Sequence, residues 1–306
     1  MKSILILLLV SALTFAEEIE IVTPDGTLSG TLQVAKKESD IGILILADSG
    51  PIDRDGNSTK EQGSNNSLKL IADGLQENGY SSLRYDKRLV GKSKGFPIDY
   101  KTVFTNFISD ATFAVEKLKS LGYKKVVIIG HGEGSLIATV TARKANADAL
   151  ISVCGIVNDG SEQILNQIKE KTPNLYEESK LIVDTLKMGK IVENMNPKLE
   201  LLFSKSVQPF MINFFKYNPE KEIAKLDIPI LVLVGKNDIQ ISAEESKILL
   251  AATKSGSYVS IEGMNHILKT VSMDPEKQLR SFSDPTLELN GNLVESIVEY
   301  LETIEN

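Results

Sequence analysis

A glycine-rich turn near the middle of the chain is the first place where the sequence could carry chemistry. This elbow turn reads GHGEG over residues 130–134, directly after the apolar run 126–129 and before the apolar stretch 136–138. A strand, a tight turn and a helix in this order form the context in which a G-x-S-x-G sequence presents a serine nucleophile to a substrate. Here Gly132 stands at the central position, so the sequence predicts the turn without its nucleophile.

Two other glycine motifs are excluded by their spacing. A dinucleotide loop requires G-x-G-x-x-G after the first strand of a sheet, whereas the elbow turn is spaced G-x-G-x-G and follows a later strand. The string Gly91-Lys92-Ser93 ends like a phosphate-binding loop, but Asp86 stands where such a loop needs its first glycine. We therefore expect no nucleotide cofactor.

An acid and a histidine follow later strands. Asp238 lies in the loop after the buried run 230–234, and His266 lies after the predicted strand 258–261. Turn, acid and histidine then occur in the chain order of a hydrolytic triad, each after a strand. We expect His266 to act as general base and acid, and Asp238 to fix its tautomer and stabilise its imidazolium form. The other histidine, His131, is interpreted as a packing and hydrogen-bonding residue.

Short apolar runs separated by helical periods must position these residues. The runs do not alternate between apolar and polar, which is typical of strands buried on both faces of a parallel sheet. They cover residues 41–47, 82–85, 126–129, 149–153 and 230–234. Amphipathic stretches predict crossover helices at residues 68–78, 104–121 and 136–144. This alternation predicts an α/β fold, with a mostly parallel central sheet flanked by helices.

The remaining segments add a hairpin, an insertion and two helices. Alternating residues around Pro24-Asp25-Gly26 predict an antiparallel β-hairpin at the start. Residues 158–225 are helical in period, rich in Lys and Glu and dotted with proline, and one crossover rarely needs so many residues. We predict a helical cap insertion there, in a core of residues 17–157 and 226–306. Helices are expected at 243–252 and 293–304.

The N-terminus and the composition limit where the protein acts and what it binds. Residues 1–16 have the charged, apolar and small-residue parts of a secretory signal, and their apolar run is shorter than the ~20 residues that span a bilayer. We therefore expect a periplasmic or secreted protein, without stable membrane insertion after cleavage. A net charge of −7 argues against nucleic acid as a partner. Cys154 is the only cysteine, so no intramolecular disulfide can form.

Two further segments resemble a known family. Residues 49–57 (SGPIDRDGN) are similar to GSGPxDRDG, and residues 83–88 (LRYDKR) to RYDKRG, in exported serine hydrolases of the α/β-hydrolase family near the serine aminopeptidase (S33-like) and esterase group. The resemblance implies that backbone N–H groups of Ser49 and Glu133 form the oxyanion hole. Asp48 and Leu89 stand where that family usually has glycine. The charged residues of both segments are interpreted mainly as an internal salt-bridge network.

The resemblance implies a hydrolase of carboxylic esters or peptide-like amides, with a small-molecule ester or peptide as substrate. With Gly132 at the nucleophile position, four interpretations stay open: a disabled hydrolase, a pseudoenzyme that binds an acyl or peptide ligand under the cap, direct hydrolysis by water lodged in the space of the missing serine, or a substitute nucleophile at Ser135. Ser135 is the least favoured because it lies about one helical turn further on. No metal or organic cofactor is expected, since two histidines without H-E-x-x-H spacing make no zinc site. The oligomeric state is left open.

Overall fold

The computed structural model describes residues 16–36, 39–60, 62–97 and 102–305. The predicted signal segment, residues 1–16, lies outside the described residues except for Ala16. Among the described residues, no helix is long and apolar enough to cross a membrane.

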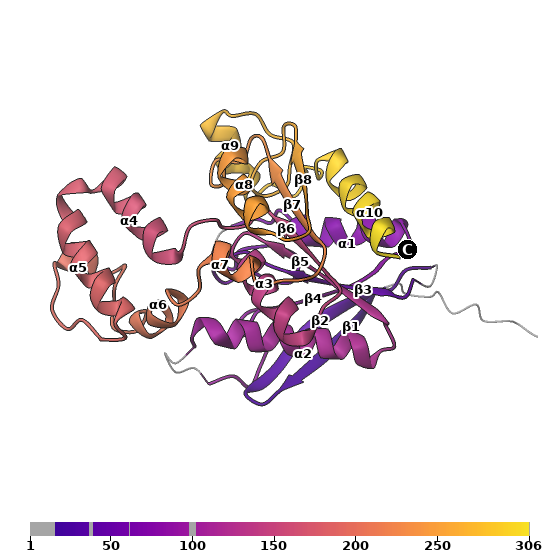
Figure 1. Ribbon diagram of the computed structural model, residues 1–306, viewed down its shortest axis with the longest axis horizontal. Helices are drawn as coiled ribbons and strands as arrows, with labels where there is room; N and C mark the ends of the chain where they lie inside the picture. Colours follow the sequence, from indigo (N-terminus) through magenta and orange to yellow (C-terminus); the bar gives the residue numbers. More distant parts are fainter. Residues whose placement is uncertain (1–15, 37–38, 61, 98–101, 306) are drawn as a thin grey trace, which may run out of the picture.

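One eight-stranded sheet forms the centre of the molecule, in the order β1-β2-β4-β3-β5-β6-β7-β8 (Figure 1). The pairs β1–β2 and β2–β4 are antiparallel, and the remaining neighbours are parallel. The strands are β1 (Ala16–Thr23), β2 (Gly26–Gln33), β3 (Ile41–Leu46), β4 (Ser81–Tyr85), β5 (Lys125–His131), β6 (Ala149–Val153), β7 (Ile230–Gly235) and β8 (Gly256–Ile261). This topology confirms the predicted α/β-hydrolase fold, including its antiparallel start.

The central strands are buried on both faces, which explains their continuous apolar sequences. Along β3, Leu44 and Leu46 face one hydrophobic cluster while Ile43 and Ile45 face the other. Helices α2 (Phe104–Ser120), α3 (Glu133–Ala145) and α8 (Ala243–Ala252) cover the first face. Helices α1 (Ser67–Glu77) and α10 (Gly291–Glu305) cover the second. Both layers therefore fix the carboxyl ends of β3, β5 and β7 relative to one another.

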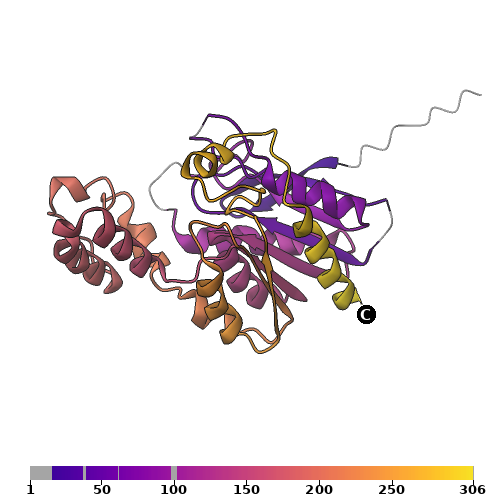
Figure 2. The same cartoon turned by 90° about the horizontal axis from the view of Figure 1, so that it is seen from above.

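The segment between β6 and β7 forms a helical lobe that projects outward from the body of the molecule (Figures 1 and 2). It contains α4 (Gly160–Lys171), α5 (Tyr176–Lys187) and α6 (Gln208–Phe214), with α7 (Pro219–Ile223) leading back to the sheet. Aromatic packing joins the lobe to α2, because the centroid of the Phe104 ring lies 4.8 Å from the ring centroid of Phe214 and 6.2 Å from that of Phe210. These rings hold α6 beside the carboxyl end of the sheet.

A short helix, α9 (Pro275–Ser281), was not expected from hydrophobic periodicity. Its N-cap is Asp274, whose carboxylate accepts the N–H of Lys277, and proline occupies its first turn. An Asp-Pro pair is a helix-start signal that could have revealed it. The helix matters for the site because the Ser281 hydroxyl accepts a hydrogen bond of 2.9 Å from the Asn265 amide, next to His266.

Candidate active site

The elbow turn keeps the shape of a nucleophile-bearing turn although it carries glycine. Gly132 has φ 55° and ψ −123°, a conformation that residues other than glycine adopt only with strain. Its N–H donates to the Val153 carbonyl at 3.1 Å, and its own carbonyl accepts the N–H of Ile156 at 3.3 Å. The path from β5 through the turn into α3 therefore follows the sequence prediction.

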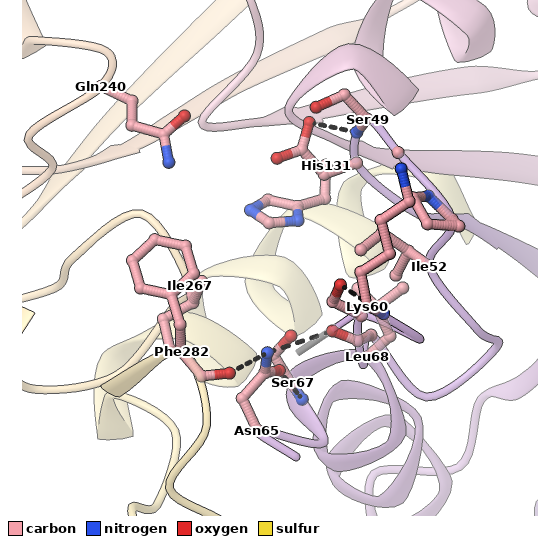
Figure 3. A pocket seen from close by; sticks show the side chains of 15 residues that line it. Ser49, Ile52, Lys60, Asn65, Ser67, Leu68, His131, Gln240, Ile267 and Phe282 are labelled. Atoms are coloured by element: carbon pink, nitrogen blue, oxygen red, sulfur yellow. Dashed lines mark hydrogen bonds between the residues drawn. The ribbon is translucent and has the colours of Figure 1, made fainter. Parts of the chain in front are cut away.

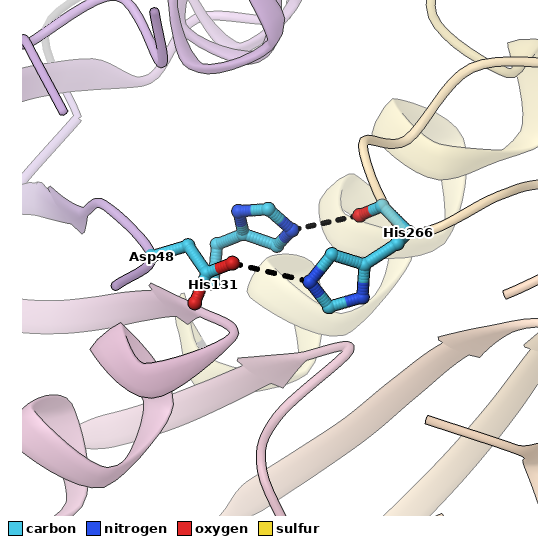
Figure 4. A group of neighbouring side chains, drawn as sticks. All are labelled: Asp48, His131 and His266. Atoms are coloured by element: carbon cyan, nitrogen blue, oxygen red, sulfur yellow. Dashed lines mark hydrogen bonds and ion pairs between the residues drawn. The ribbon is translucent and has the colours of Figure 1, made fainter. Parts of the chain in front are cut away.

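Asp238 and His266 form a buried hydrogen-bonded pair. Nδ1 of His266 donates to Oδ2 of Asp238 at 2.9 Å, and the other oxygen of Asp238 accepts the N–H groups of Gln240 and Ile241 at 2.7 and 3.0 Å. The His131 ring donates from Nε2 to the His266 carbonyl at 2.8 Å, as Figure 4 shows. His131 thus has the supporting role expected for it, because it holds the backbone of the histidine loop.

Asp48, just past the end of β3, reaches the second nitrogen of His266 (Figure 4). Its Oδ2 lies 3.2 Å from His266 Nε2, and its Oδ1 accepts the N–H of Ser49 at 2.6 Å and the N–H of Glu133 at 2.8 Å. Ser49 and Glu133 are the residues proposed as oxyanion-hole donors, and their N–H groups converge on one carboxylate oxygen. Sequence reasoning did not identify Asp48 as a site residue. The available signal was its replacement of the glycine usual in the similar family.

The carboxylate of Asp48 occupies the space that a side chain at position 132 would need. A Cβ atom on Gly132 would lie 2.0 Å from Oδ1 and 2.2 Å from Cγ of Asp48, far closer than atoms can approach. The interpretation in which a water occupies the space of the missing serine therefore requires the Asp48 carboxylate to move first. Gly132 and Asp48 are sterically complementary, because the carboxylate fits only while position 132 has no side chain.

The electrostatics of the site differ from those expected for a resting catalytic base. Burial alone would lower the pKa of His266, but the hydrogen bonds and negative charges of Asp238 and Asp48 raise it to about 10. Burial likewise opposes ionisation of Asp48 and Asp238, yet hydrogen bonding to His266 holds the pKa of both carboxyl groups below the ordinary value. At neutral pH an imidazolium therefore lies between two carboxylates, and His266 is a proton donor in this state.

Buried charges hold the loop that carries Asp48. The Lys87 ammonium donates a short hydrogen bond to the Asp48 carbonyl, and burial lowers its pKa. The guanidinium of Arg54 binds both oxygens of Asp86, at 3.0 and 2.8 Å. These contacts agree with the interpretation of the charged residues as an internal network, and they fix the backbone from which the Asp48 side chain projects.

Two cavities adjoin the Asp48 loop and share residues 49–51. The first, of about 320 Å³, is lined by Asp48, His131 and Gln240, and the rest of its wall mixes apolar side chains with polar ones such as Lys60 and Asn65 (Figure 3). The second, of about 450 Å³, is lined by residues that include Lys87 and Phe210, the latter from the helical lobe. Substrate-sized space is therefore present on the side of Asp48 and on the side of Glu133.

Ser135 lies away from this centre. Its Oγ is 2.6 Å from that of Ser152 in a buried pair, and the side chain lines neither of these cavities. The hydroxyl therefore hydrogen-bonds to Ser152 and does not open into either cavity. This placement argues against Ser135 as a substitute nucleophile.

Two groups of potential metal ligands overlap the site. They are Asp48 with His131 and His266, and Cys154 with Asp238 and His266. Both ring nitrogens of His266 already pair with carboxylates, and burial raises the pKa of the Cys154 thiol well above its usual value. Metal ligands must be deprotonated and free to coordinate, so these residues as arranged do not fit a metal ion.

Comparisons with known proteins support the fold and its relationship to hydrolases. The profile of the family "Serine aminopeptidase, S33" matches residues 63–206, a stretch that includes the elbow turn. No curated protein matches the chain. Similar solved structures include an esterase of Pyrococcus furiosus, with TM-score 0.60 and 17% identity over 95% of this chain and 91% of that one.

Two further esterases have comparable similarity. Est1E of Butyrivibrio proteoclasticus, solved with ferulic acid, has TM-score 0.58 and 16% identity over 93% of this chain and 98% of that one. A thermophilic esterase of Thermogutta terrifontis has TM-score 0.57 and 16% identity over 95% of this chain and 100% of that one. The chain therefore has the α/β-hydrolase fold, and the profile match over residues 63–206 supports its relationship to the S33 serine aminopeptidases.

Proposed function

We propose that this protein hydrolyses small carboxylic esters or peptide-like amides, with a catalytic efficiency well below that of enzymes with an elbow serine. Once Asp48 moves aside, His266 would remove a proton from a water molecule that attacks the acyl carbon, and would return a proton to the leaving group. Asp238 would fix the His266 tautomer, and the N–H groups of Ser49 and Glu133 would stabilise the oxyanion. The observation that carries the proposal is the convergence of both N–H groups and His266 Nε2 on the Asp48 carboxylate beside Gly132, the N–H groups on Oδ1 and Nε2 on Oδ2. An acyl group in the place of this carboxylate would meet the same donors.

The low rate follows from the position of Asp48. An ester carbonyl can enter the oxyanion hole only when the carboxylate leaves it, which breaks two hydrogen bonds from backbone N–H groups to a charged acceptor. Each such bond contributes about 1.5–3 kcal/mol, so the displacement costs roughly 3–6 kcal/mol. A tenfold rate change corresponds to about 1.4 kcal/mol, and we expect turnover about 10²- to 10⁴-fold below that of an open site.

The cavities suggest where the parts of a substrate would bind. Phe210 is the residue of the helical lobe that lines the larger cavity, so the lobe would influence substrate size there. We propose that residues 158–225 act as a cap on the core of residues 17–157 and 226–306. We also propose that residues 1–16 direct export, so that the substrate would be met in the periplasm or outside the cell.

Hydrolysis of p-nitrophenyl esters from acetate to octanoate tests the proposed activity. The comparison uses wild type, His266→Ala and Ser135→Ala, with folding checked by circular dichroism. Ser135→Ala is the matched control because its hydroxyl lies next to the elbow turn but outside the site. Activity lost in His266→Ala and kept in Ser135→Ala would support the proposal. Absence of hydrolysis by folded wild type, or activity unaffected by His266→Ala, would overturn it.

A binding function without turnover is the second candidate. It is favoured by the closed oxyanion hole, because Asp48 occupies the place of an acyl oxygen in the resting structure. This candidate predicts that acyl or peptide ligands bind without being consumed. Calorimetric titration with the same esters and with their free acids would distinguish it, since a pure binding protein would give saturable heat and no product.

A further inference from the structure

The two oxygens of Asp48 have different surroundings, and together these surroundings suit a nucleophile. Oδ1 lies under the N–H groups of Ser49 and Glu133, while Oδ2 lies 3.2 Å from His266 Nε2. The Asp48 side chain is 23% exposed, whereas that of His266 is only 3% exposed. Asp48 is thus the member of the pair that a ligand can reach, and it lines the cavity of about 320 Å³.

The position of Oδ1 selects the type of carbon that Asp48 can attack. Attack on an acyl carbon creates a charged oxygen on the substrate, and that oxygen would need the N–H donors that Oδ1 already occupies. Displacement of a halide from a saturated carbon creates no such oxygen, and opening of an epoxide creates an alkoxide that can be neutralised by a proton and does not need the N–H donors. Carboxylates form covalent intermediates in several enzyme classes. Asp48 needs no base to become nucleophilic, because its hydrogen bonds favour the ionised form.

We propose that Asp48 is a nucleophile that displaces a leaving group from a saturated carbon, forming an alkyl ester that water then hydrolyses. The substrate class is an alkyl electrophile, such as a primary alkyl halide or an epoxide. Apolar residues of the cavity wall, Ile52, Leu68, Ile267 and Phe282, suit an alkyl group (Figure 3). This activity goes beyond the proposed ester hydrolysis and does not depend on it.

In the first step, a bond forms between Oδ2 and the substrate carbon as the bond from that carbon to the leaving group breaks. With an alkyl halide, the leaving group takes the electron pair and departs as halide. With an epoxide, the ring oxygen takes the electron pair and becomes an alkoxide that stays attached to the alkyl group and gains a proton. Asp48 becomes a neutral ester, so His266 loses one of the two carboxylate charges that hold its proton. The imidazolium then releases that proton, to solvent or to the alkoxide, and becomes a neutral base.

In the second step, His266 removes a proton from water and the oxygen of that water bonds to Cγ of Asp48. Oδ1 takes the negative charge beneath the N–H groups of Ser49 and Glu133, which are already in contact with it. Collapse breaks the bond between Cγ and Oδ2, and the alcohol leaves with a proton from His266. The new Asp48 carboxylic acid returns its proton to His266, which restores the resting state. The net reaction converts an alkyl halide and water into an alcohol and hydrogen halide, and it converts an epoxide and water into a 1,2-diol.

Covalent labelling tests this directly. His266→Gln should form the ester but be unable to activate water, so incubation with 1-bromobutane or 1,2-epoxybutane should add one alkyl group to the peptide that contains Asp48. Asp48→Asn is the matched control, because it removes the nucleophile with little change in size, and it should show no label and at least a 10³-fold lower rate of product release. Peptide mass spectrometry reads the label, and the two probes distinguish a halide from an oxygen leaving group.

Wild type provides a measurement that needs no variant to fold. A single turnover of either probe in ¹⁸O-water should place one ¹⁸O atom in the Asp48 carboxylate, because the product alcohol takes its oxygen from Oδ2. The proposal would be overturned if folded His266→Gln carried no label and wild-type Asp48 took up no ¹⁸O. It would also be overturned if Asp48→Asn carried an equally strong label. Labelling of Asp48 without p-nitrophenyl ester hydrolysis would support this activity and reject the ester function. Hydrolysis of p-nitrophenyl esters without labelling of Asp48 would support the ester function and reject this activity.

Discussion

Replacing Asp48 with glycine and Gly132 with serine should convert this site into an open serine hydrolase. In Gly132→Ser alone, the new Cβ would lie 2.0 Å from Asp48 Oδ1, so the carboxylate must move and would still compete for His266 and the oxyanion donors. In Asp48→Gly alone, the oxyanion hole opens but water is still the nucleophile. Only the double variant Asp48→Gly/Gly132→Ser provides serine, histidine and a free hole together.

The expected coupling between the two positions is large. Displacing Asp48 from two N–H donors costs roughly 3–6 kcal/mol, so the double variant should exceed Gly132→Ser by about 10²- to 10⁴-fold in kcat/KM. The assay is p-nitrophenyl butyrate hydrolysis by wild type, both single variants and the double variant, analysed as a double-mutant cycle. His266→Ala in the double background should abolish the gain. Equal activity of Gly132→Ser and the double variant would refute the reasoning, because Asp48 would then not obstruct the site.

Three further outcomes test the electrostatics and packing. In ¹⁵N NMR, the His266 ring should stay doubly protonated at pH 8. Asp48→Asn should lower the pKa of His266, since it removes one of the two anions that raise this pKa. A wild-type ring that titrates near pH 6.5 would contradict the assignment. Because folding raises the pKa of His266, its pairing with the two carboxylates should stabilise the fold fully below about pH 6.5. This stabilisation should be lost as the pH rises toward about 10, which urea unfolding at several pH values would show. Asp110→Ala should lower the free energy of unfolding by about 3–5 kcal/mol, because the buried Arg88 guanidinium loses both of its 2.8 Å hydrogen bonds to Asp110. A loss of under about 1 kcal/mol in urea unfolding would count against this account. Ser135→Ala should cost about 1–3 kcal/mol in the same measurement through its lost buried hydrogen bond, and any large loss of ester hydrolysis in this variant would reopen its role as a nucleophile.

Local sequence patterns were sufficient to predict the architecture of the sheet and most of its helices. Helix α8 begins and ends at the residues expected from the sequence, and β6 does so as well. The runs of β3 and β7 indicated strands because both of their faces are buried, and such burial leaves a continuous apolar sequence. Helix α9 was missed because it is short and its start signal, Asp274 before proline, has little periodicity to accompany it.

The candidate site was only partly accessible to the same reasoning. The sequence by itself determined that Gly132 stands at the centre of the elbow turn and that Asp238 and His266 follow later strands, because position after a strand is a local property. The tertiary structure alone decided what faces His266. Asp48 is 218 residues away in the chain, and no local pattern reveals that its carboxylate fills the oxyanion hole and lies 3.2 Å from the His266 ring. Neither could the sequence give the protonation of that ring, because a pKa depends on which charges folding brings into contact.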